Sequence, residues 1–263
     1  MVARIETRSV KLKLEGLYKS FIVDGRKIPV LEEIELSVRK GEFVSVVGPS
    51  GCGKTTLLNC IAGLDHPDAG TVELDGSPVE RRLGMVGVMP QKDLLLPWRT
   101  VLDNAILGLE VMGYTRSKAK ERAVGLVEIF GLSGFERQYP SALSGGMRQR
   151  AAFLRTLLAD QDLILLDEPL GALDAFTRSQ MQEWLMSLWG SLGKTIVLIT
   201  HDVEEAILLS DRVYVLTPRP AWVKLEVVVN LPRPRNYQMV TDKAFVRLKG
   251  ILMRSLRGET AQS

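Results

Sequence analysis

Short apolar runs rich in β-branched residues alternate with segments of helical periodicity along most of this 263-residue chain. Four of these runs are predicted to be buried strands, at residues 43–47, 163–166, 195–200 and 212–216. Between them, apolar side chains recur every three or four positions, as at Met181, Leu185 and Leu188. Strands that alternate with amphipathic helices predict an α/β fold with a mostly parallel sheet covered on both faces.

Three parts of the chain depart from this alternation. Near the N-terminus, residues 11–14 and 30–38 predict shorter strands of an antiparallel flap. From residue 93 to 159, helical patterns broken by glycine and proline predict a helical subdomain inserted into the α/β core. A proline-rich stretch follows Thr217 and a helix is expected at about 242–257, so the end of the chain is predicted to be a short extension.

Composition narrows the possible partners. Hydrophobic residues make up 46% of the chain and charged residues 25%, and the net charge is +3 with Lys and Arg dispersed, so no nucleic-acid partner is expected. No apolar run reaches the roughly 18–20 residues that span a bilayer, and the segment with Arg4 and Glu6 lacks the apolar core of a signal peptide. The chain is therefore expected in the cytosol, with Cys52 and Cys60 as free thiols.

A glycine-rich loop stands between the first buried strand and the helix that follows it. It matches the phosphate-loop pattern GxxxxGK[ST], and its residues are Gly48, Pro49, Ser50, Gly51, Cys52, Gly53, Lys54, Thr55 and the adjoining Thr56. Such a loop surrounds phosphates with backbone N–H groups, and the positive end of the next helix adds to the attraction. Lys54 is expected to neutralise the β and γ phosphates, and the Thr55 hydroxyl to ligate Mg²⁺. The alternative is a chance glycine-rich turn, against which the strand–loop–helix context argues.

A second motif places two carboxylates at the end of an apolar strand, at Asp167 and Glu168. The carboxyl end of a parallel strand is where ligands bind in open α/β sheets, so Asp167 is predicted to hold Mg²⁺ directly or through water. Glu168 is then placed to accept a proton from an attacking water molecule. An exposed acidic turn after a buried strand is the plain alternative, and the phosphate loop in the same chain argues against it.

A second anion site is predicted at residues 143–149, where Leu-Ser-Gly-Gly-Met-Arg-Gln precedes a helix. Ser144 is a suitable N-cap, and Gly145 and Gly146 complete a site that resembles another phosphate loop. One molecule has no evident need of two such sites around one γ-phosphate, whereas a head-to-tail dimer has. With this motif upstream of the acidic strand, the chain closely resembles the ABC ATPase family.

The other motifs of that family follow in the expected order. Gln91 resembles the Q-loop glutamine, which in the family contacts Mg²⁺ or the attacking water and reports on the transmembrane partner. Asp174 resembles the D-loop residue that crosses the dimer interface, and His201 resembles the switch histidine that contacts the γ-phosphate. Phe21 stands where the family stacks an aromatic ring on adenine, with Tyr18 as a second candidate.

The resemblance implies a division of the chain and a shared nucleotide site. It implies a RecA-like P-loop core with the antiparallel β flap at 1–92 and 160–217, a helical signature subdomain at 93–159, and a C-terminal extension at 218–263. ATP and Mg²⁺ are the expected ligands. Two copies, or this chain and a homologous ATPase subunit, are expected to hold two ATP between the phosphate loop of one and Ser144 and Gly146 of the other.

One ATPase unit with no fused membrane domain resembles the subunit of a bacterial importer. The runs at 94–98 and 174–178 and the pair Arg219-Pro220 resemble the importer group for nitrate, sulfonates, taurine and pyrimidine-type vitamin precursors. Integral membrane permease subunits are then the direct partners, an extracytoplasmic solute-binding protein an indirect one, and the cytoplasmic face of the membrane the location. The alternative is a soluble ABC-type ATPase that regulates a ribosome or DNA complex; the apolar run beside Gln91 and the dispersed basic residues argue against it.

Overall fold

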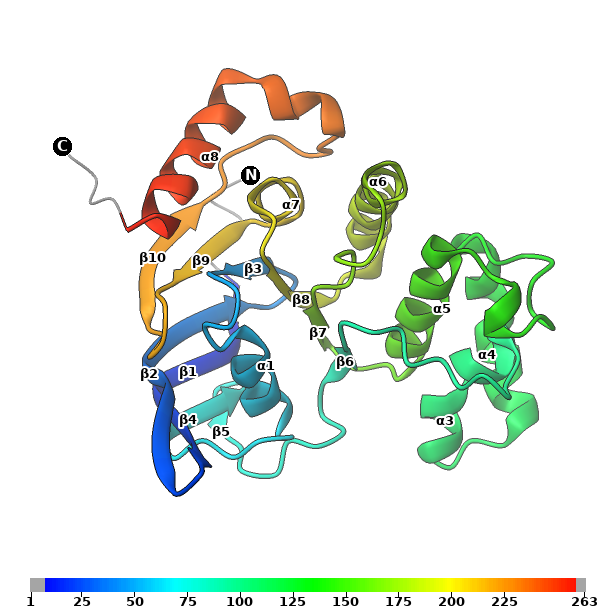
Figure 1. Ribbon diagram of the computed structural model, residues 1–263. Helices are drawn as coiled ribbons and strands as arrows, with labels where there is room; N and C mark the ends of the chain where they lie inside the picture. Colours follow the sequence, from blue (N-terminus) through cyan, green and yellow to red (C-terminus); the bar gives the residue numbers. More distant parts are fainter. Residues whose placement is uncertain (1–7, 259–263) are drawn as a thin grey trace.

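The computed structural model describes residues 8–258, so the N-terminal segment with Arg4 and Glu6 lies outside the described residues. Two sheets form the core of the molecule, helices α3–α5 stand to one side of it, and helix α8 lies above β9 and β10 at the top of the view (Figure 1). Within the described residues, no helix has the length and the apolar character that crossing a membrane requires.

The smaller sheet is antiparallel, with strand order β2-β1-β4-β5. Its strands are β1 (Val10–Val23), β2 (Arg26–Arg39), β4 (Ala69–Leu74) and β5 (Ser77–Pro78). The antiparallel flap therefore exists, but its first two strands are much longer than the sequence predicted. They form one hairpin that turns at Asp24 and Gly25, where φ is positive (50° and 73°), as tight hairpin turns require. The outer half of this hairpin is exposed, so its residues lack the buried apolar pattern by which strands are predicted.

The larger sheet is mostly parallel, with strand order β10-β9-β3-β8-β7-β6. Its strands are β3 (Phe43–Val47), β6 (Gly87–Met89), β7 (Leu163–Asp167), β8 (Thr195–Thr200), β9 (Arg212–Leu216) and β10 (Val223–Val228). The four strands predicted as buried runs agree with β3, β7, β8 and β9 to within one residue. Strand β10, which pairs antiparallel with β9, was not predicted, because an edge strand in a proline-rich stretch buries few of its side chains.

Helices cover the sheets and fill the segment between β6 and β7. They are α1 (Lys54–Ala62), α2 (Val101–Ala105), α3 (Leu107–Val111), α4 (Arg116–Ile129), α5 (Gly145–Leu158), α6 (Ala175–Leu192), α7 (Val203–Leu209) and α8 (Lys243–Leu256), with the 3-10 turns η2 (Pro140–Ala142) and η3 (Tyr237–Thr241). One apolar core joins the smaller sheet, α1 and one face of the larger sheet, and a second joins the opposite face to α2–α6. The division of the chain at residues 93 and 159 stays a prediction.

Two arginines fasten the C-terminal extension to the core. Arg235 is 5% exposed and donates to the carbonyl groups of Ile207 (2.8 Å), Ser210 (2.6 Å) and Val229 (3.1 Å). Burial lowers the pKa of this guanidinium to about 10, so it remains charged at neutral pH. Arg233 pairs with Asp211 at 2.9 Å. The charge of Arg235 therefore meets the unpaired carbonyls at the C-terminal end of α7, the helix that follows His201.

Replacing Arg235 with alanine is expected to lower the free energy of unfolding by about 3 kcal/mol, because several buried carbonyl groups lose a charged donor at once. Chemical denaturation at neutral pH measures the change. The matched control is Arg247→Ala on the exposed side of α8, expected to cost less than about 0.5 kcal/mol. Equal stability of the Arg235→Ala chain and the unmodified chain would show that the extension is not held in this way.

Candidate functional site

The phosphate loop between β3 and α1 owes its shape to glycine. Gly51 and Gly53 have φ of 74° and 122°, which other residues rarely adopt. A Cβ atom on Gly53 would lie 2.7 Å from a methyl carbon of Val30, and one on Gly48 would lie 2.9 Å from the Cys52 sulfur. Helix α1 begins at Lys54 with no side-chain cap, so its first N–H groups remain available to an anion. Both cysteines are buried free thiols, as predicted.

Lys54 connects the loop to the acidic strand end. Its side chain is 6% exposed, and Nζ donates to the carbonyl oxygens of Gly48 (3.0 Å) and Pro49 (3.1 Å). The same nitrogen lies 3.8 Å from Glu168 Oε1. The ammonium group is thus held inside the curve of the phosphate loop, at the position where phosphate oxygens would replace the two carbonyl groups as acceptors.

The structure brings Thr55 to Asp167, although 112 residues separate them. Thr55 follows strand β3 and Asp167 ends strand β7. These two strands are not neighbours in the sheet, because β8 lies between them. Thr55 Oγ1 donates to Asp167 Oδ2 at 3.0 Å. Burial raises the pKa of Asp167, and the hydrogen bond from Thr55 opposes this shift.

The Thr55–Asp167 pair fits Mg²⁺. A hydroxyl and a carboxylate are the oxygen donors this ion prefers, and Mg²⁺ in nucleotide sites takes its other ligands from water and phosphate. A cation would also offset the cost of burying the Asp167 carboxylate. Among the described residues there is no cluster of three or more His, Cys, Asp or Glu side chains that could hold a metal ion by themselves, so phosphates would have to complete the site.

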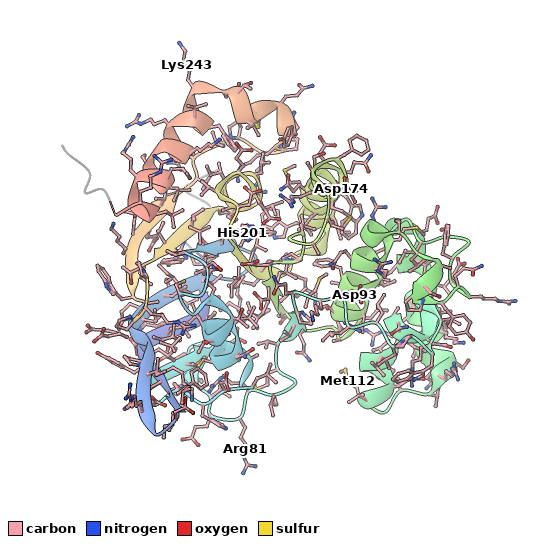
Figure 2. All side chains as sticks on the ribbon, viewed as in Figure 1. Arg81, Asp93, Met112, Asp174, His201 and Lys243 are labelled. Atoms are coloured by element: carbon pink, nitrogen blue, oxygen red, sulfur yellow. The ribbon has the colours of Figure 1, made fainter. Side chains whose placement is uncertain are left out.

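Glu168 also lies close to Gln91 and His201, two of the other predicted catalytic residues. Its φ of 42° is unusual for a residue with a side chain, and its backbone N–H donates to the carbonyl of Ile199 at 2.8 Å. Its Oε2 atom accepts a hydrogen bond from Gln91 Nε2 at 3.3 Å and lies 3.0 Å from His201 Nδ1. In Figure 2, His201 lies near the middle of the molecule, at the carboxyl end of β8. The residues that follow β6 and β8, Gln91 and His201, thus meet at one carboxylate oxygen of Glu168, which follows β7.

The residues of the predicted second anion site lie at the start of α5, which packs against the start of α6. Ser144 caps α5 by accepting from the N–H of Met147 at 3.3 Å. Asp174 caps α6 by accepting from the N–H and the hydroxyl of Thr177 at 3.0 and 2.7 Å. A Cβ atom on Gly146 would lie 3.0 Å from a methyl carbon of Thr177, which explains the glycine. Among the described residues, no hydrogen bond or ion pair joins Ser144, Gly145, Gly146 or Asp174 to the phosphate loop of the same chain.

Phe21 lies in the exposed outer half of β1, with Lys19 Nζ 5.2 Å from the centre of its ring. Tyr18 on the same strand is also partly exposed. No interaction between described residues joins Phe21 to the phosphate loop. Stacking of Phe21 on adenine therefore stays a prediction.

A hollow of about 530 Å³ opens beside Gln91, lined also by Leu94, Gly145 and Leu173. Leu94 and Trp98 are 58% and 72% exposed, whereas Leu95 is buried. Arg155 of α5, which sequence reasoning missed, donates to the carbonyl groups of Asp93 (2.6 Å) and Leu94 (2.7 Å). It therefore ties the segment after Gln91 to the helix that carries the second anion site. Its only sequence signal is that it stands among apolar residues in the second half of α5.

The loop, the buried lysine and the paired acidic residues at the strand ends define a P-loop nucleoside triphosphatase. Comparison with known families is consistent with this class, because residues 31–171 match the ABC transporter family. The chain belongs to the ABC transporter family. The predicted fold class and the predicted resemblance are both confirmed.

Three curated relatives are named as import ATP-binding proteins. The chain is 41% identical over 254 residues to the aliphatic sulfonates protein SsuB of Bacillus cereus, covering 96% of this chain and 98% of the relative. It is 45% identical over 219 residues to the taurine protein TauB of Yersinia pestis (83% and 84% covered). It is 43% identical over 229 residues to the formylaminopyrimidine protein ThiZ of Halalkalibacterium halodurans (87% and 89% covered).

A similar solved structure is the dimeric, post-hydrolysis state of an ATP-binding cassette bound to ADP and phosphate. It is 31% identical to this chain, with a TM-score of 0.73, and the match covers 84% of this chain and all of the solved chain. The chain described here is accordingly an ABC ATPase, and the predicted enzyme class is confirmed. The individual site residues remain predictions supported by the geometry described above.

Proposed function

We propose that this chain hydrolyses ATP at the interface of a dimer and thereby powers solute uptake through a separate membrane permease. The observation that carries this proposal is the division of the site within one chain. Lys54, Asp167 and Glu168 lie together, whereas the predicted second anion site around Ser144 has no described contact with the phosphate loop. A second copy in head-to-tail orientation would bring its own Ser144 to the first copy's phosphate loop. The dimeric state of the solved relative supports this arrangement.

The start of α5 has the groups needed to bind the γ-phosphate of the facing copy. The Ser144 side chain accepts the N–H of Met147. The N–H groups of Gly145 and Gly146 have no intrahelical partner, because these residues are the first two of the helix. Together with the dipole of this 14-residue helix they favour a negative charge. The γ-phosphate supplies that charge and its loss on hydrolysis removes it, so the dimer closes on ATP and opens after the reaction. The opening moves the permease.

Within each site, this chain's residues prepare a water molecule for in-line attack on the γ-phosphorus. Gln91 and His201 orient the water, and Glu168 accepts its proton as the new bond to phosphorus forms and the bond to the ADP oxygen breaks. Lys54 neutralises the β and γ phosphates. Thr55 and Asp167, with Gln91 as a further candidate, would hold Mg²⁺, which when bound offsets charge on the phosphate oxygens.

The surface beside Gln91 is the proposed contact with the permease. Leu94 and Trp98 are exposed apolar side chains, and Leu94 lines the 530 Å³ hollow, where a helix of a partner can place its own apolar side chains. Because Gln91 also contacts Glu168, movement of this segment would reach the hydrolysis site directly. The chain then works at the cytoplasmic face of the membrane, and it meets a solute-binding protein only through the permease. The import names of its relatives support this proposal, and no observation favours a soluble regulator of a ribosome or DNA complex.

Copurification tests the transport role. A tagged Glu168→Gln chain, incubated with ATP and Mg²⁺ and recovered from detergent-solubilised native membranes, is expected to carry a polytopic membrane protein that mass spectrometry identifies. A Leu94→Glu variant in the same background is expected to lose that protein while still binding ATP. Recovery of ribosomal or DNA-bound proteins in place of a membrane protein would contradict the transport role and leave the ATPase activity unaffected.

A further inference from the structure

Glu205, in the first turn of α7, is a buried carboxyl group that the proposed mechanism does not use. It is 3% exposed, four residues after His201 in the chain. An acidic residue in a first helical turn is usually explained by the helix dipole and sits at the surface, as its neighbour Glu204 does in a pair with Lys249. The burial of Glu205 calls for a different explanation.

Glu205 ends a chain of hydrogen bonds that fixes the turn carrying His201. The N–H of Asp202 donates to Thr200 Oγ1 at 3.0 Å, and the Thr200 hydroxyl donates to Glu205 Oε2. Asp202 in turn accepts from the N–H groups of Glu204 and Glu205 at 2.9 and 3.2 Å. Thr200 and Asp202, the residues on either side of His201, are therefore both bonded to the start of α7. The side chain of His201 leaves this turn toward Glu168.

Glu205 also lines a small cavity next to Glu168 and His201. Oε1 is buried without a hydrogen-bond partner among the described residues. A small cavity of about 10 Å³, room for about one water molecule, is lined by Glu205 together with Glu168, Gly171 and His201. The carboxyl group of Glu205 thus shares a cavity with the two residues that the proposed function assigns to water activation.

The pKa of Glu205 is raised to about 7, mainly by burial and in smaller part by the nearby carboxylates of Asp202 and Glu168. The hydrogen bond from Thr200 and the positive charge of Arg178 on α6 oppose the shift, since both favour the ionised form. Lys249 of α8 forms its ion pair with Glu204 and not with Glu205. A hydrogen bond from a hydroxyl to a carboxylate is stronger than one to a neutral carboxyl group, so the turn is held most firmly when Glu205 is ionised.

We propose that Glu205 is a positioning residue for ATP hydrolysis, which holds His201 against Glu168 through the Thr200 hydroxyl and does so best in its ionised form. This inference rests on the proposed roles of His201 and Glu168. It assigns no contact with ATP to Glu205 itself. Loss of its charge is therefore expected to change kcat and to leave the KM for ATP nearly unchanged.

Steady-state ATP hydrolysis between pH 6 and pH 8 tests the role of the charge. Glutamine accepts the Thr200 hydrogen bond without a charge, so the ratio of kcat for Glu205→Gln to kcat for the unmodified chain is expected near 1 at pH 6, falling to about one third at pH 8. The matched control, Glu204→Gln, is expected to show a ratio that does not depend on pH. A pH-independent ratio for Glu205→Gln would overturn the role of the charge.

Removal of the hydrogen bond tests the positioning. At pH 8, Glu205→Ala is expected to lower kcat about tenfold, with KM for ATP within about twofold, and Glu205→Gln is expected to restore kcat to about one third of the unmodified value. Thr200→Val breaks the same hydrogen bond at its other end, so it should cause a similar loss, and the double variant should lose little more. This second route keeps the test valid if Glu205→Ala does not fold. If the losses in kcat of the two single variants added in the double variant, the proposed coupling between Glu205 and Thr200 would be overturned.

His201→Ala measured in parallel separates this inference from the proposed function. If His201→Ala is impaired but Glu205→Ala and Thr200→Val hydrolyse ATP at the unmodified rate, the role of Glu205 is wrong and that of His201 stands. If His201→Ala itself retains the full rate, both roles are wrong.

Discussion

A Glu168→Gln chain is expected to bind ATP as tightly as the unmodified chain and to hydrolyse it at least about 100 times more slowly, the lower end of what a positioned general base contributes. Glutamine has the shape of glutamate, so the unusual backbone at φ 42° and its hydrogen bond to Ile199 are retained. The amide can still meet Gln91 and His201. The amide cannot accept the proton of the attacking water, so ATP is still bound but is hydrolysed much more slowly.

Phosphate release measured under saturating ATP and Mg²⁺ gives the rate, and equilibrium binding of a fluorescent ATP analogue gives the affinity. The matched control is Glu121→Gln, an exposed carboxyl group on α4, which is expected to keep the full rate. A Glu168→Gln chain that turns over ATP within about threefold of the control would show that another group accepts the proton.

Replacing Lys54 with alanine is expected to weaken ATP binding about 100-fold. The ammonium group is buried in the curve of the phosphate loop, where charge-assisted hydrogen bonds to phosphate are worth about 1.5–3 kcal/mol each. Alanine also leaves the carbonyl groups of Gly48 and Pro49 facing the phosphates with no positive charge between them. Arginine is not expected to restore binding, because its planar fork is larger than the space that a lysine ammonium fills.

Titration with the same fluorescent analogue measures this loss. Lys118→Ala, on the exposed side of α4, removes an equal charge far from the loop in sequence and serves as the control, with unchanged affinity expected. An affinity for Lys54→Ala within about threefold of the control would mean that backbone N–H groups alone hold the phosphates.

The strands whose bounds the sequence predicted most closely, β3, β7, β8 and β9, are those that are completely buried. Strands β3, β7 and β8 are buried along their whole length, so most of their residues are apolar and the strands can be recognised in the sequence. The outer halves of β1 and β2 and the edge strand β10 are exposed, and their side chains carry no such pattern. These segments are not buried, so they lack the apolar pattern by which strands are predicted from sequence.

Part of the candidate site could likewise be predicted from the sequence, and part of it could not. The residue types and their order indicated the phosphate loop, the acidic pair and the second anion site. The contacts between Thr55 and Asp167, and between Glu168 and His201, depend on the strand order β3-β8-β7, which no local pattern contains. Glu205 and Arg155 were missed because each is one of several charged residues on its helix, and only the tertiary structure shows that Glu205 is buried and that Arg155 binds the carbonyl groups of Asp93 and Leu94.

Analytical ultracentrifugation of the Glu168→Gln chain tests the central claim that two copies share each ATP. With saturating ATP and Mg²⁺ the chain is expected to sediment as a dimer, and with ADP as a monomer. A Glu168→Gln chain that also carries Ser144→Arg is expected to bind ATP but to remain monomeric, because the start of α5 can no longer approach a facing γ-phosphate. A Glu168→Gln chain that stays monomeric at saturating ATP, or a Ser144→Arg chain that dimerises as well as its parent, would contradict the shared site.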